Sequence, residues 1–428
     1  METIFAVSSG MPPAAIAVLR ISGPRAFETV GAFCGALPEP RRATVRAVRV
    51  PGTGDLLDRA LLLCFPGPES ATGEDLAELH LHGGRAVVRA VEAALAAQPG
   101  LRAAEPGEFT RRALANGRID LSEAEGLGDL LMAETEGQRR AALRAAEGAV
   151  RREVEGWTAR LLALAARVEA ELDHSDEDDV AAGNETLADV RDGAAALAAA
   201  IETVAGRPPV ERLRDGVRVV LAGPPNAGKS TLLNALAGRE AAIVSPISGT
   251  TRDRIEVPAV REGIAWLLTD TAGLAEATDD PIEAIGVERA QAAVREADIL
   301  LWLGDDPPPP HPQALWVHAR ADRCEGRPQA GQISVSVLAG QGLEALWEAM
   351  TAKAQVLLPA PDQLALNARQ RDLALAGASP LRAVAAERDL LIVAEHLRSA
   401  MRAFDGISGR AGVEAMLDAL FSRFCIGK

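Results

Sequence analysis

Residues 223–230 read GPPNAGKS, and they constrain the fold of this chain more than any other segment. A β-type apolar run at residues 217–221 precedes this pattern, and a helical run at residues 231–236 follows it. Glycines at both ends let several backbone N–H groups converge at a helix N-terminus, which is a favourable place for phosphate. The combination predicts a strand, a phosphate-binding loop and a helix in a parallel α/β sheet.

The residues of this loop have separate predicted roles. We expect Lys229 to reach the β and γ phosphates of a nucleotide and the Ser230 hydroxyl to bind Mg²⁺. The other predicted nucleotide contacts in and after the loop are Gly223, Asn226, Ala227, Gly228 and Thr231.

A second motif, DTAG at residues 270–273, follows the next predicted strand at residues 264–268. The carboxylate of Asp270 can hold Mg²⁺ through water, and the N–H of Gly273 can sense the γ-phosphate. Thr271 and Ala272 complete the predicted contacts of this motif. Thr251 lies in a loop between the two motifs and is the candidate for a switch threonine that closes on Mg²⁺ when γ-phosphate is present. A surface threonine in a turn is the alternative.

Position 274, directly after Gly273, is leucine. A Ras-like GTPase orients its attacking water with glutamine at that point, and leucine has no polar group for this task. Glu283 is the nearest suitable carboxylate, and we hypothesise that it orients the water. A solvated glutamate at a helix end is the competing interpretation, and the residues alone favour neither.

The segment expected to recognise the base reads ARAD at residues 319–322. Asp322 can accept two hydrogen bonds from N1 and N2 of guanine. Ala319 lacks the amide that usually fixes this loop, and Arg320 can lay its stem over the ring without being equivalent to lysine. One missing neutral hydrogen bond costs about 0.5–1.5 kcal/mol, so we expect a weakened but not abolished preference for guanine. The loop predicted to back the base contains Ser336 and Val337.

The strand and helix pattern divides the chain into four segments. Residues 1–117 alternate apolar and polar positions, with predicted strands at 4–7, 16–19 and 60–64 and a helix at 86–95, which is typical of an α+β domain. Residues 211–358 form the α/β nucleotide domain, with further strands at 299–303 and 314–317. Residues 118–210 and 359–428 are predicted helical, and we expect them to form one bundle that the α/β domain interrupts.

Apolar residues spaced alternately by four and three support the helical prediction, because they form one stripe along a helix. The first stripe consists of Val150, Val154, Trp157, Leu161, Leu164, Val168 and Leu172. The second consists of Leu390, Ala394, Leu397, Met401 and Phe404.

Composition limits the classes of function. A net charge of −15 over 428 residues argues against a protein that holds nucleic acid mainly by its overall field. An aromatic content of 3%, with no tyrosine, argues against a platform for base stacking. The four cysteines are too scattered for a disulfide scaffold or a zinc cluster. We see no signal peptide and no membrane span, which together fit a reducing cytoplasm.

The order of the motifs resembles that of the bacterial and organellar tRNA modification GTPases of the MnmE or TrmE family. The resemblance covers nearly the whole chain, and its most specific segments lie outside the nucleotide motifs. They are IAVLRISGP at residues 16–24, HGG at 82–84, EPGEFTRRA at 105–113 and FCIGK at 424–428.

The resemblance implies a multidomain protein whose N-terminal domain binds 5-formyl- or methylene-tetrahydrofolate and forms a homodimer. It also implies a helical domain with an inserted Ras-like P-loop GTPase domain. An FAD-dependent partner of the MnmG or GidA type is expected to complete a heterotetramer. Together the two proteins would place an aminomethyl or carboxymethylaminomethyl group on C5 of the wobble uridine, position 34, of certain tRNAs. Potassium near the GTP would let two GTPase domains dimerise and hydrolyse GTP without an arginine finger.

Site residues follow from the resemblance where motifs align. Asn226 matches the potassium contact and Glu283 matches the catalytic glutamate, while Cys425 matches a terminal thiol needed for modification. The implied folate contacts are Arg20, Glu78, Arg118 and Lys428. The predicted catalytic set is thus Glu283, Lys229, Thr251 and Cys425. The pair Ala319 and Arg320 is the chief departure from the family pattern.

Two other functions fit part of the sequence. A ribosome-assembly GTPase would have a similar nucleotide domain, but it would need an added basic RNA-binding module. A nucleotide sensor without hydrolysis would not need the intact set of residues Lys229, Ser230, Thr251, Asp270 and Glu283.

Overall fold

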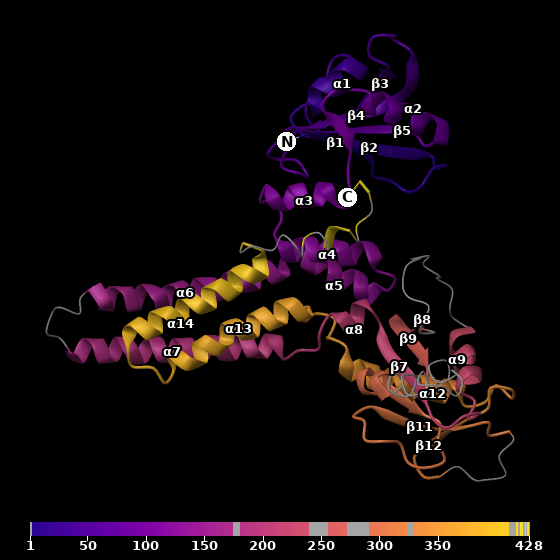
Figure 1. Cartoon of the computed structure of the whole chain (residues 1–428), viewed down its shortest axis with the longest axis vertical. Coiled ribbons are helices and arrows are strands. Elements are labelled where there is room, and N and C mark those ends of the chain that lie inside the picture. Colours follow the sequence, from indigo (N-terminus) through magenta and orange to yellow (C-terminus); the bar gives the residue numbers. More distant parts are fainter. Residues whose placement is uncertain are drawn as a thin grey trace, which may run out of the picture. The chain divides into compact units, whose positions relative to one another are not determined.

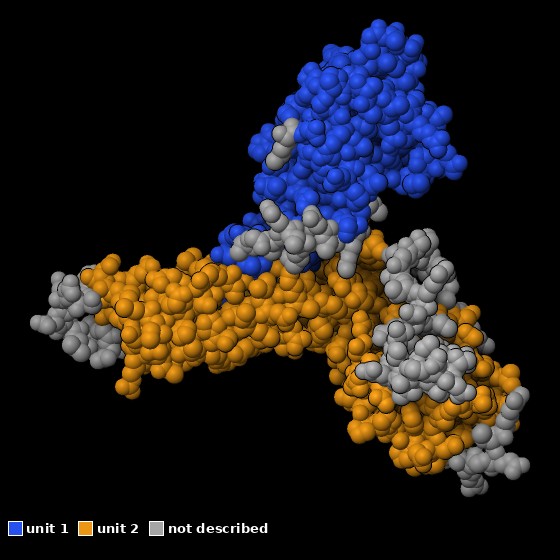
Figure 2. Space-filling model, in the orientation of Figure 1, with its two compact units in different colours: residues 1–128, 145–154, 404–428 blue, residues 129–144, 155–403 orange. Residues whose placement is uncertain are grey.

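The structure is a computed structural model of the chain and describes residues 2–173, 180–238, 256–271, 291–322, 329–410, 417, 420–422, 424 and 426–427. The chain divides into two compact units, which are coloured separately in Figure 2. Unit 1 contains residues 1–128, 145–154 and 404–428, and unit 2 contains residues 129–144 and 155–403.

A six-stranded sheet is the centre of unit 1 (Figure 1). Neighbouring strands are antiparallel, except that β1 and β6 are parallel. In spatial order the strands are β3 (Thr44–Arg49), β4 (Leu56–Phe65), β5 (Leu76–His82), β2 (Ile16–Ser22), β1 (Thr3–Val7) and β6 (Leu101–Ala103).

The two faces of this sheet have different roles. Helices α1 (Ala26–Cys34) and α2 (Arg85–Ala96) share one core with alternate strand residues such as Leu19, Ile21 and Leu79. Because successive side chains of a strand point to opposite faces, Arg20 and Glu78 lie on the other face. That face therefore presents polar groups beside a small apolar cluster that includes Phe109 of α3 (Glu108–Ala115).

Residues near the C-terminus complete unit 1. Pro106 and Ile426 form an isolated antiparallel bridge, and the Ser8 hydroxyl donates a 2.7 Å hydrogen bond to the carbonyl of Gly427. Gly107 has φ of +69°, and an added Cβ there would lie 2.8 Å from the carbonyl oxygen of Phe421. The last described residues thus extend the edge of the N-terminal fold.

Helices α6, α7, α13 and α14 run together as a bundle (Figure 1). Leu164 of α6 packs against Gly193 of α7, and Arg382 of α13 forms an ion pair with Glu202 of α7. The bundle helices are α6 (Ala149–Asp173), α7 (Val180–Ala205), α13 (Ala368–Val384) and α14 (Leu390–Ser408). The described chain also forms α4 (Leu121–Met132), α5 (Glu136–Ala146) and α8 (Glu211–Arg214), and α8 contacts β7 and β9. The pairing of α7 with α13 joins the two helical segments that the sequence pattern predicts to pack together.

The predicted apolar stripes largely agree with burial. Along α6, Val150 to Val168 of the stripe are buried, and only Leu172 at the end is half-buried. The buried face of α14 is rotated from the predicted one, because Val393 and Ala400 are buried while Leu390 and Met401 are only half-buried.

A second six-stranded sheet forms the α/β part of unit 2. Its strands in spatial order are β12 (Gln332–Val335), β11 (Ala314–Ala319), β10 (Ile299–Trp302), β7 (Val217–Ala222), β9 (Ile264–Asp270) and β8 (Glu256–Arg261). Helices α9 (Lys229–Gly238) and α12 (Leu343–Leu357) pack on it through one buried apolar core. The predicted strands at 217–221, 264–268, 299–303 and 314–317 are all present, and the predicted fold class is confirmed.

One strand that the sequence pattern did not predict, β8, is antiparallel in a sheet that was predicted to be parallel. The edge strand β8 pairs with β9 in the antiparallel direction, whereas the other neighbours are parallel. The two residues between them, Glu262 and Gly263, have φ of +52° and +75°. A two-residue loop with positive φ at both positions makes a tight hairpin, and a hairpin imposes antiparallel pairing.

The predicted domain boundaries after residues 117, 210 and 358 stay a prediction, because the two compact units divide the chain differently. In the described part of the chain, no helix has the length and apolar character needed to cross a membrane.

Candidate functional site

The phosphate loop connects β7 to α9 in a conformation that depends on its glycines. Gly223 and Gly228 have φ of +149° and +97°, and Asn226 between them has φ of +58°. A Cβ on Gly223 would lie 3.1 Å from the backbone of Leu303, so this position also lets two strands approach closely. The Lys229 ammonium is buried inside the loop and donates to the carbonyls of Gly223 and Pro224 at 3.0 and 2.9 Å. The carbonyl groups of the loop therefore fix the position of the lysine charge.

Two of the three residues predicted to contact Mg²⁺, Ser230 and Asp270, meet at the end of this loop. The Ser230 hydroxyl donates to Oδ2 of Asp270 at 2.5 Å. Asp270 ends β9, and the next residue, Thr271, is fixed by its side chain and N–H to the carbonyl of Leu221 at 2.8 and 3.2 Å. A hydroxyl and a carboxylate are hard oxygen donors, which suit Mg²⁺. Bound there, the ion would neutralise charge on the phosphate oxygens.

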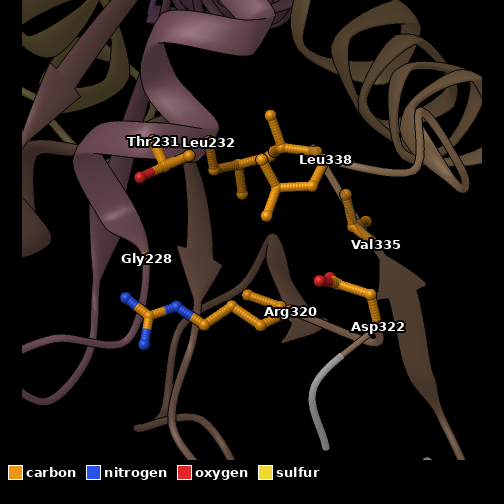
Figure 3. A pocket seen from close by; sticks show the side chains of 9 residues that line it. Gly228, Thr231, Leu232, Arg320, Asp322, Val335 and Leu338 are labelled. Atoms are coloured by element: carbon orange, nitrogen blue, oxygen red, sulfur yellow. The ribbon is translucent and has the colours of Figure 1, made fainter.

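A pocket of about 210 Å³ lies beside the phosphate loop (Figure 3). Its lining comes from the loop, from the start of α9, and from the ends of β11 and β12 with the segments that follow them. The lining residues are Gly228, Thr231, Leu232, Ala319, Arg320, Asp322, Val335, Val337 and Leu338. The predicted base-recognition residues Arg320, Asp322 and Val337 are thus gathered around one cavity.

Ser336 has a role in this pocket that the sequence does not reveal. Its hydroxyl is buried, accepts a hydrogen bond from the N–H of Ala339 at 3.1 Å and donates to Oδ1 of Asp322 at 2.6 Å. Because a backbone donor already points at the hydroxyl oxygen, its proton goes to Asp322. Ser336 therefore positions the Asp322 carboxylate, which faces the pocket in Figure 3.

The predicted folate contacts Arg20 and Glu78 lie opposite each other on β2 and β5. Arg20 Nε donates to Glu78 Oε1 at 2.9 Å, and His80 Nε2 lies 3.2 Å from Glu78 Oε2. The three side chains remain partly accessible on the face of the sheet that α1 and α2 do not cover. A guanidinium beside a carboxylate matches a ligand that carries both carboxylates and N–H donors.

The third predicted contact, Arg118, is exposed and lies close to Gly73. The neighbours of Gly73, Thr72 and Glu74, both bind the Ser22 hydroxyl, at 2.7 and 3.0 Å. Ser22 is two residues along β2 from Arg20, so these contacts link Arg118 to the same face of the sheet.

A buried ionic network beneath this face is not apparent from the sequence. Arg112 forms 3.0 Å contacts with both Glu74 and Glu108, and Glu108 also binds Arg102 at 2.6 Å. Burial of Glu108 opposes its ionisation, but hydrogen bonds from Arg102, the backbone of Glu105 and Arg112 outweigh burial and lower its pKa to about 2. The only local signal is the spacing of Glu108 and Arg112 by four residues, which also describes an exposed helix pair.

Several predicted residues lie outside the described residues: Thr251, Ala272, Gly273, Glu283, Cys425 and Lys428. Their roles stay predictions. Of the described cysteines, Cys34 and Cys64 are buried, and burial raises the pKa of each thiol to about 11. Both therefore stay protonated at neutral pH and are poor nucleophiles.

A mainly parallel sheet with Lys229 inside a phosphate loop, Ser230 against Asp270, and an acidic group in a neighbouring pocket defines a P-loop GTPase. Two family descriptions match the chain: "GTP-binding protein TrmE N-terminus" over residues 3–118 and "MnmE helical domain" over residues 121–425. The chain belongs to the MnmE family of tRNA modification GTPases and is a GTP hydrolase of tRNA modification.

Curated relatives match over the whole length. The tRNA modification GTPase MnmE of Rhizorhabdus wittichii is 57% identical over 100% of this chain and 97% of its own length. The protein of the same name from Erythrobacter litoralis is 54% identical over 100% of both chains. Among solved structures, the G domain of the T. maritima FeoB iron transporter is 24% identical, with 32% of this chain and 99% of that chain covered and a TM-score of 0.25.

Proposed function

We propose that this GTP hydrolase depends on potassium and acts with an FAD-dependent partner subunit on C5 of the wobble uridine of certain tRNAs. The added group is an aminomethyl or carboxymethylaminomethyl group, and its one-carbon unit comes from a tetrahydrofolate bound by the N-terminal domain of a homodimer. The work takes place in the cytoplasm, where the tRNA substrate is. These tasks fall to separate domains with boundaries near residues 117, 210 and 358. Residues 1–117 bind the folate and form the homodimer, and residues 211–358 bind and hydrolyse GTP.

One observation carries the proposal for hydrolysis: Lys229, Ser230 and Asp270 converge at a single phosphate loop. Lys229 neutralises the β and γ phosphates, and Ser230 with Asp270 holds Mg²⁺ beside them. Glu283 orients the attacking water, because position 274 offers only leucine. Thr251 closes on the metal ion when γ-phosphate is present.

The potassium requirement rests on Asn226. Its backbone is in the left-handed region, in the middle of the loop, and the residue is exposed. The amide oxygen is an uncharged donor of the kind that a large monovalent cation accepts. Asn226 would hold such a cation beside the phosphates, where its positive charge would take the place of an arginine finger when two GTPase domains meet.

The folate assignment rests on Arg20 and Glu78, which form a polar pair on an open sheet face. Arg118 and Lys428 add positive charge for the glutamate carboxylates of the ligand, and Cys425 contributes a thiol to the modification reaction. The buried ionic network around Arg112 lies beneath the same face. Its member Glu74 accepts a hydrogen bond from the Ser22 hydroxyl.

The test of the nucleotide mechanism is phosphate release from GTP and from ATP by the purified full chain, in potassium and in sodium buffers. We expect turnover of GTP in potassium and little turnover in sodium. Comparable turnover of ATP would contradict guanine selection by Asp322. Equal rates in the two salts would contradict the potassium proposal, and no turnover in either would leave a nucleotide sensor.

Replacing Arg20 with methionine is expected to weaken binding of 5-formyltetrahydrofolate about 10- to 100-fold, because a hydrogen bond to a charged group contributes about 1.5–3 kcal/mol. Equilibrium dialysis of the full chain measures this affinity. Arg42→Met is the matched control, since Arg42 forms an exposed ion pair with Glu39 elsewhere in unit 1. GTP turnover should be unchanged in both variants. Equal folate affinity in wild type and Arg20→Met would exclude Arg20 from the site.

A further inference from the structure

The connection between the parallel strands β10 and β11 is short. It runs from residue 303 to residue 313, all of which the structure describes, and none of these residues is helical. Adjacent parallel strands are usually joined by a crossover of a dozen or more residues, most often an α-helix that packs on the sheet. Other contacts must therefore hold this crossover, residues 303–313, in place.

Two tryptophan side chains hold the first half of the crossover. Trp302 and Trp316 are register partners on β10 and β11. Their neighbours along both strands belong to the core under α9 and α12, so the two indoles lie on the opposite face of the sheet. The indole N–H of Trp316 donates to the carbonyl of Gly304 at 2.8 Å, and that of Trp302 donates to the carbonyl of Asp306 at 2.8 Å.

The second half of the crossover is attached at its far end. Four prolines, Pro307 to Pro310, follow the turn directly, and their rings restrict the backbone. The N–H of Gln313 donates to His311 Nδ1 at 3.1 Å, which leaves the proton on Nε2, 3.0 Å from the carbonyl of Ala297. A stiff segment thus joins two fixed attachments.

The turn held by the indoles continues from Leu303, which packs on the phosphate loop. The N–H of Leu303 donates to the carbonyl of Ala222 at 2.8 Å. A Cβ on Gly223, the first residue of the loop, would lie 3.1 Å from the carbonyl carbon of Leu303. The carbonyl of Gly223 in turn accepts a hydrogen bond from the Lys229 ammonium. Leu303 therefore limits how far Gly223 can move, and Gly223 helps to place the lysine charge.

Gly304 shows how closely the indoles hold this turn. A Cβ there would lie 2.6 Å from Nε1 of Trp302. The φ of Gly304 lies outside the left-handed region, so the close contact, rather than the backbone conformation, requires glycine. Any side chain at this position would displace the indole ring.

We propose that Trp316 and Trp302 are positioning residues of the GTPase site. By holding the turn after β10, they keep Leu303 against Gly223, and Gly223 keeps the Lys229 ammonium in place for the phosphates. The inference rests on the proposed contact of Lys229 with the β and γ phosphates, and it adds two residues that lie behind the loop. Because the lysine reaches only those phosphates, the indoles contribute to binding of GDP and GTP but not of GMP.

The experiment compares dissociation constants of GDP and GMP for the full chain, measured by displacement of a fluorescent GDP, together with kcat/KM for GTP. Trp316→Phe keeps an aromatic ring but removes the N–H that binds the buried carbonyl of Gly304. It is expected to weaken GDP binding about 3- to 10-fold, as for one lost hydrogen bond, and to leave GMP binding within about twofold of wild type. The value of kcat/KM falls by at least the same factor as GDP affinity, because Lys229 also stabilises the transition state.

Two further variants accompany this measurement. Gly304→Ala places a methyl group against the indole of Trp302 and is expected to change GDP and GMP binding in the same way as Trp316→Phe. Trp157→Phe is the matched control, because it makes the same replacement at a buried tryptophan of α6 in the helical bundle. Both affinities should keep their wild-type values in this control.

Wild-type affinity for GDP in Trp316→Phe and Gly304→Ala would overturn the proposal. An equal loss of GDP and GMP binding would also overturn it, because the indoles would then only support the folding of the domain. Failure of the underlying lysine assignment looks different: Lys229→Ala would itself leave the ratio of GDP to GMP affinity unchanged. A wild-type ratio in Trp316→Phe beside a lowered ratio in Lys229→Ala would contradict the role of the indoles alone.

Discussion

Replacing Lys229 with alanine is expected to lower kcat/KM for GTP hydrolysis at least about 100- to 1000-fold, the usual cost of losing one preorganised charge donor. The ammonium group is buried and fixed by the carbonyls of Gly223 and Pro224, so the phosphates meet it without a conformational search. No water molecule can replace a buried positive charge beside a developing negative one. The loss therefore includes both nucleotide affinity and transition-state stabilisation.

Steady-state phosphate release, combined with direct nucleotide binding, measures the two parts. Lys353→Ala is the control, because Lys353 lies on α12 in the same sheet domain and donates to Gln313. Its removal tests whether loss of any lysine charge has the same effect. If Lys229→Ala retained turnover within tenfold of wild type, the phosphate assignment of this loop would be wrong.

Replacing Arg112 with methionine is expected to destabilise unit 1 by about 3–5 kcal/mol, the typical cost of removing one partner from a buried ion pair. Arg112 is 8% exposed and lies between Glu74 and Glu108. Methionine fills most of the volume of Arg112 but removes its positive charge, which leaves the buried carboxylate of Glu108 with Arg102 alone and the partly buried carboxylate of Glu74 without this ion pair. Arg111→Met is the control on the neighbouring position of α3, where the guanidinium faces the ring of Phe421.

Tryptophan fluorescence makes this experiment specific. All five tryptophans of the chain belong to unit 2, so their fluorescence reports denaturation of that unit alone. Hydrogen exchange of the β2 and β5 peptides reports unit 1. Lower protection of those peptides with an unchanged fluorescence transition is the expected result. Equal losses in both units, or none, would contradict the role given to Arg112.

The pH dependence of exchange protection gives a second measurement on the Arg112→Met variant. The pKa of Glu108 is about 2 in the folded protein, below its ordinary value of 4.5. The folded state therefore favours the ionised carboxylate. This contribution is present above pH 4.5 and is lost as pH falls toward 2. In Arg112→Met the pKa lies closer to its ordinary value, so exchange protection in unit 1 should fall less steeply over that interval.

Local sequence was sufficient to predict the phosphate-site half of the nucleotide domain. Two local patterns predicted the structure here: the glycine spacing of residues 223–230 and the apolar run that forms β7. Each depends on only a few neighbouring residues, and tertiary contacts did not change the local structure that they favour. The same holds for the stripe on α6, where a single periodic pattern determines one buried face. The meeting of Ser230 and Asp270 also followed, because adjacent parallel strands end at the same edge of a sheet.

Contacts between residues far apart in the sequence could not be predicted from such local patterns. Ser336 was predicted to back the base, and its bond to Asp322 depends on how two loops after β11 and β12 come together. Glu74 lies 38 residues from Arg112, and both would pass for ordinary surface charges in the sequence. Strand β8 and its antiparallel direction were not predicted, because Glu262 and Gly263 do not form one of the common hairpin turn pairs.

The packing of α7 against α13 has a consequence for the synthesis of the chain. The ion pair between Glu202 and Arg382 joins residues that are 180 positions apart. At ordinary translation rates, on the order of 10 to 40 s pass between the appearance of the two partners at the ribosome. During that interval the entire nucleotide domain emerges and can fold, while α7 lacks its packing partner α13. The catalytic insert is thus complete before the helical body that carries it, and slow or stalled translation after residue 205 would expose α7 to aggregation or proteolysis.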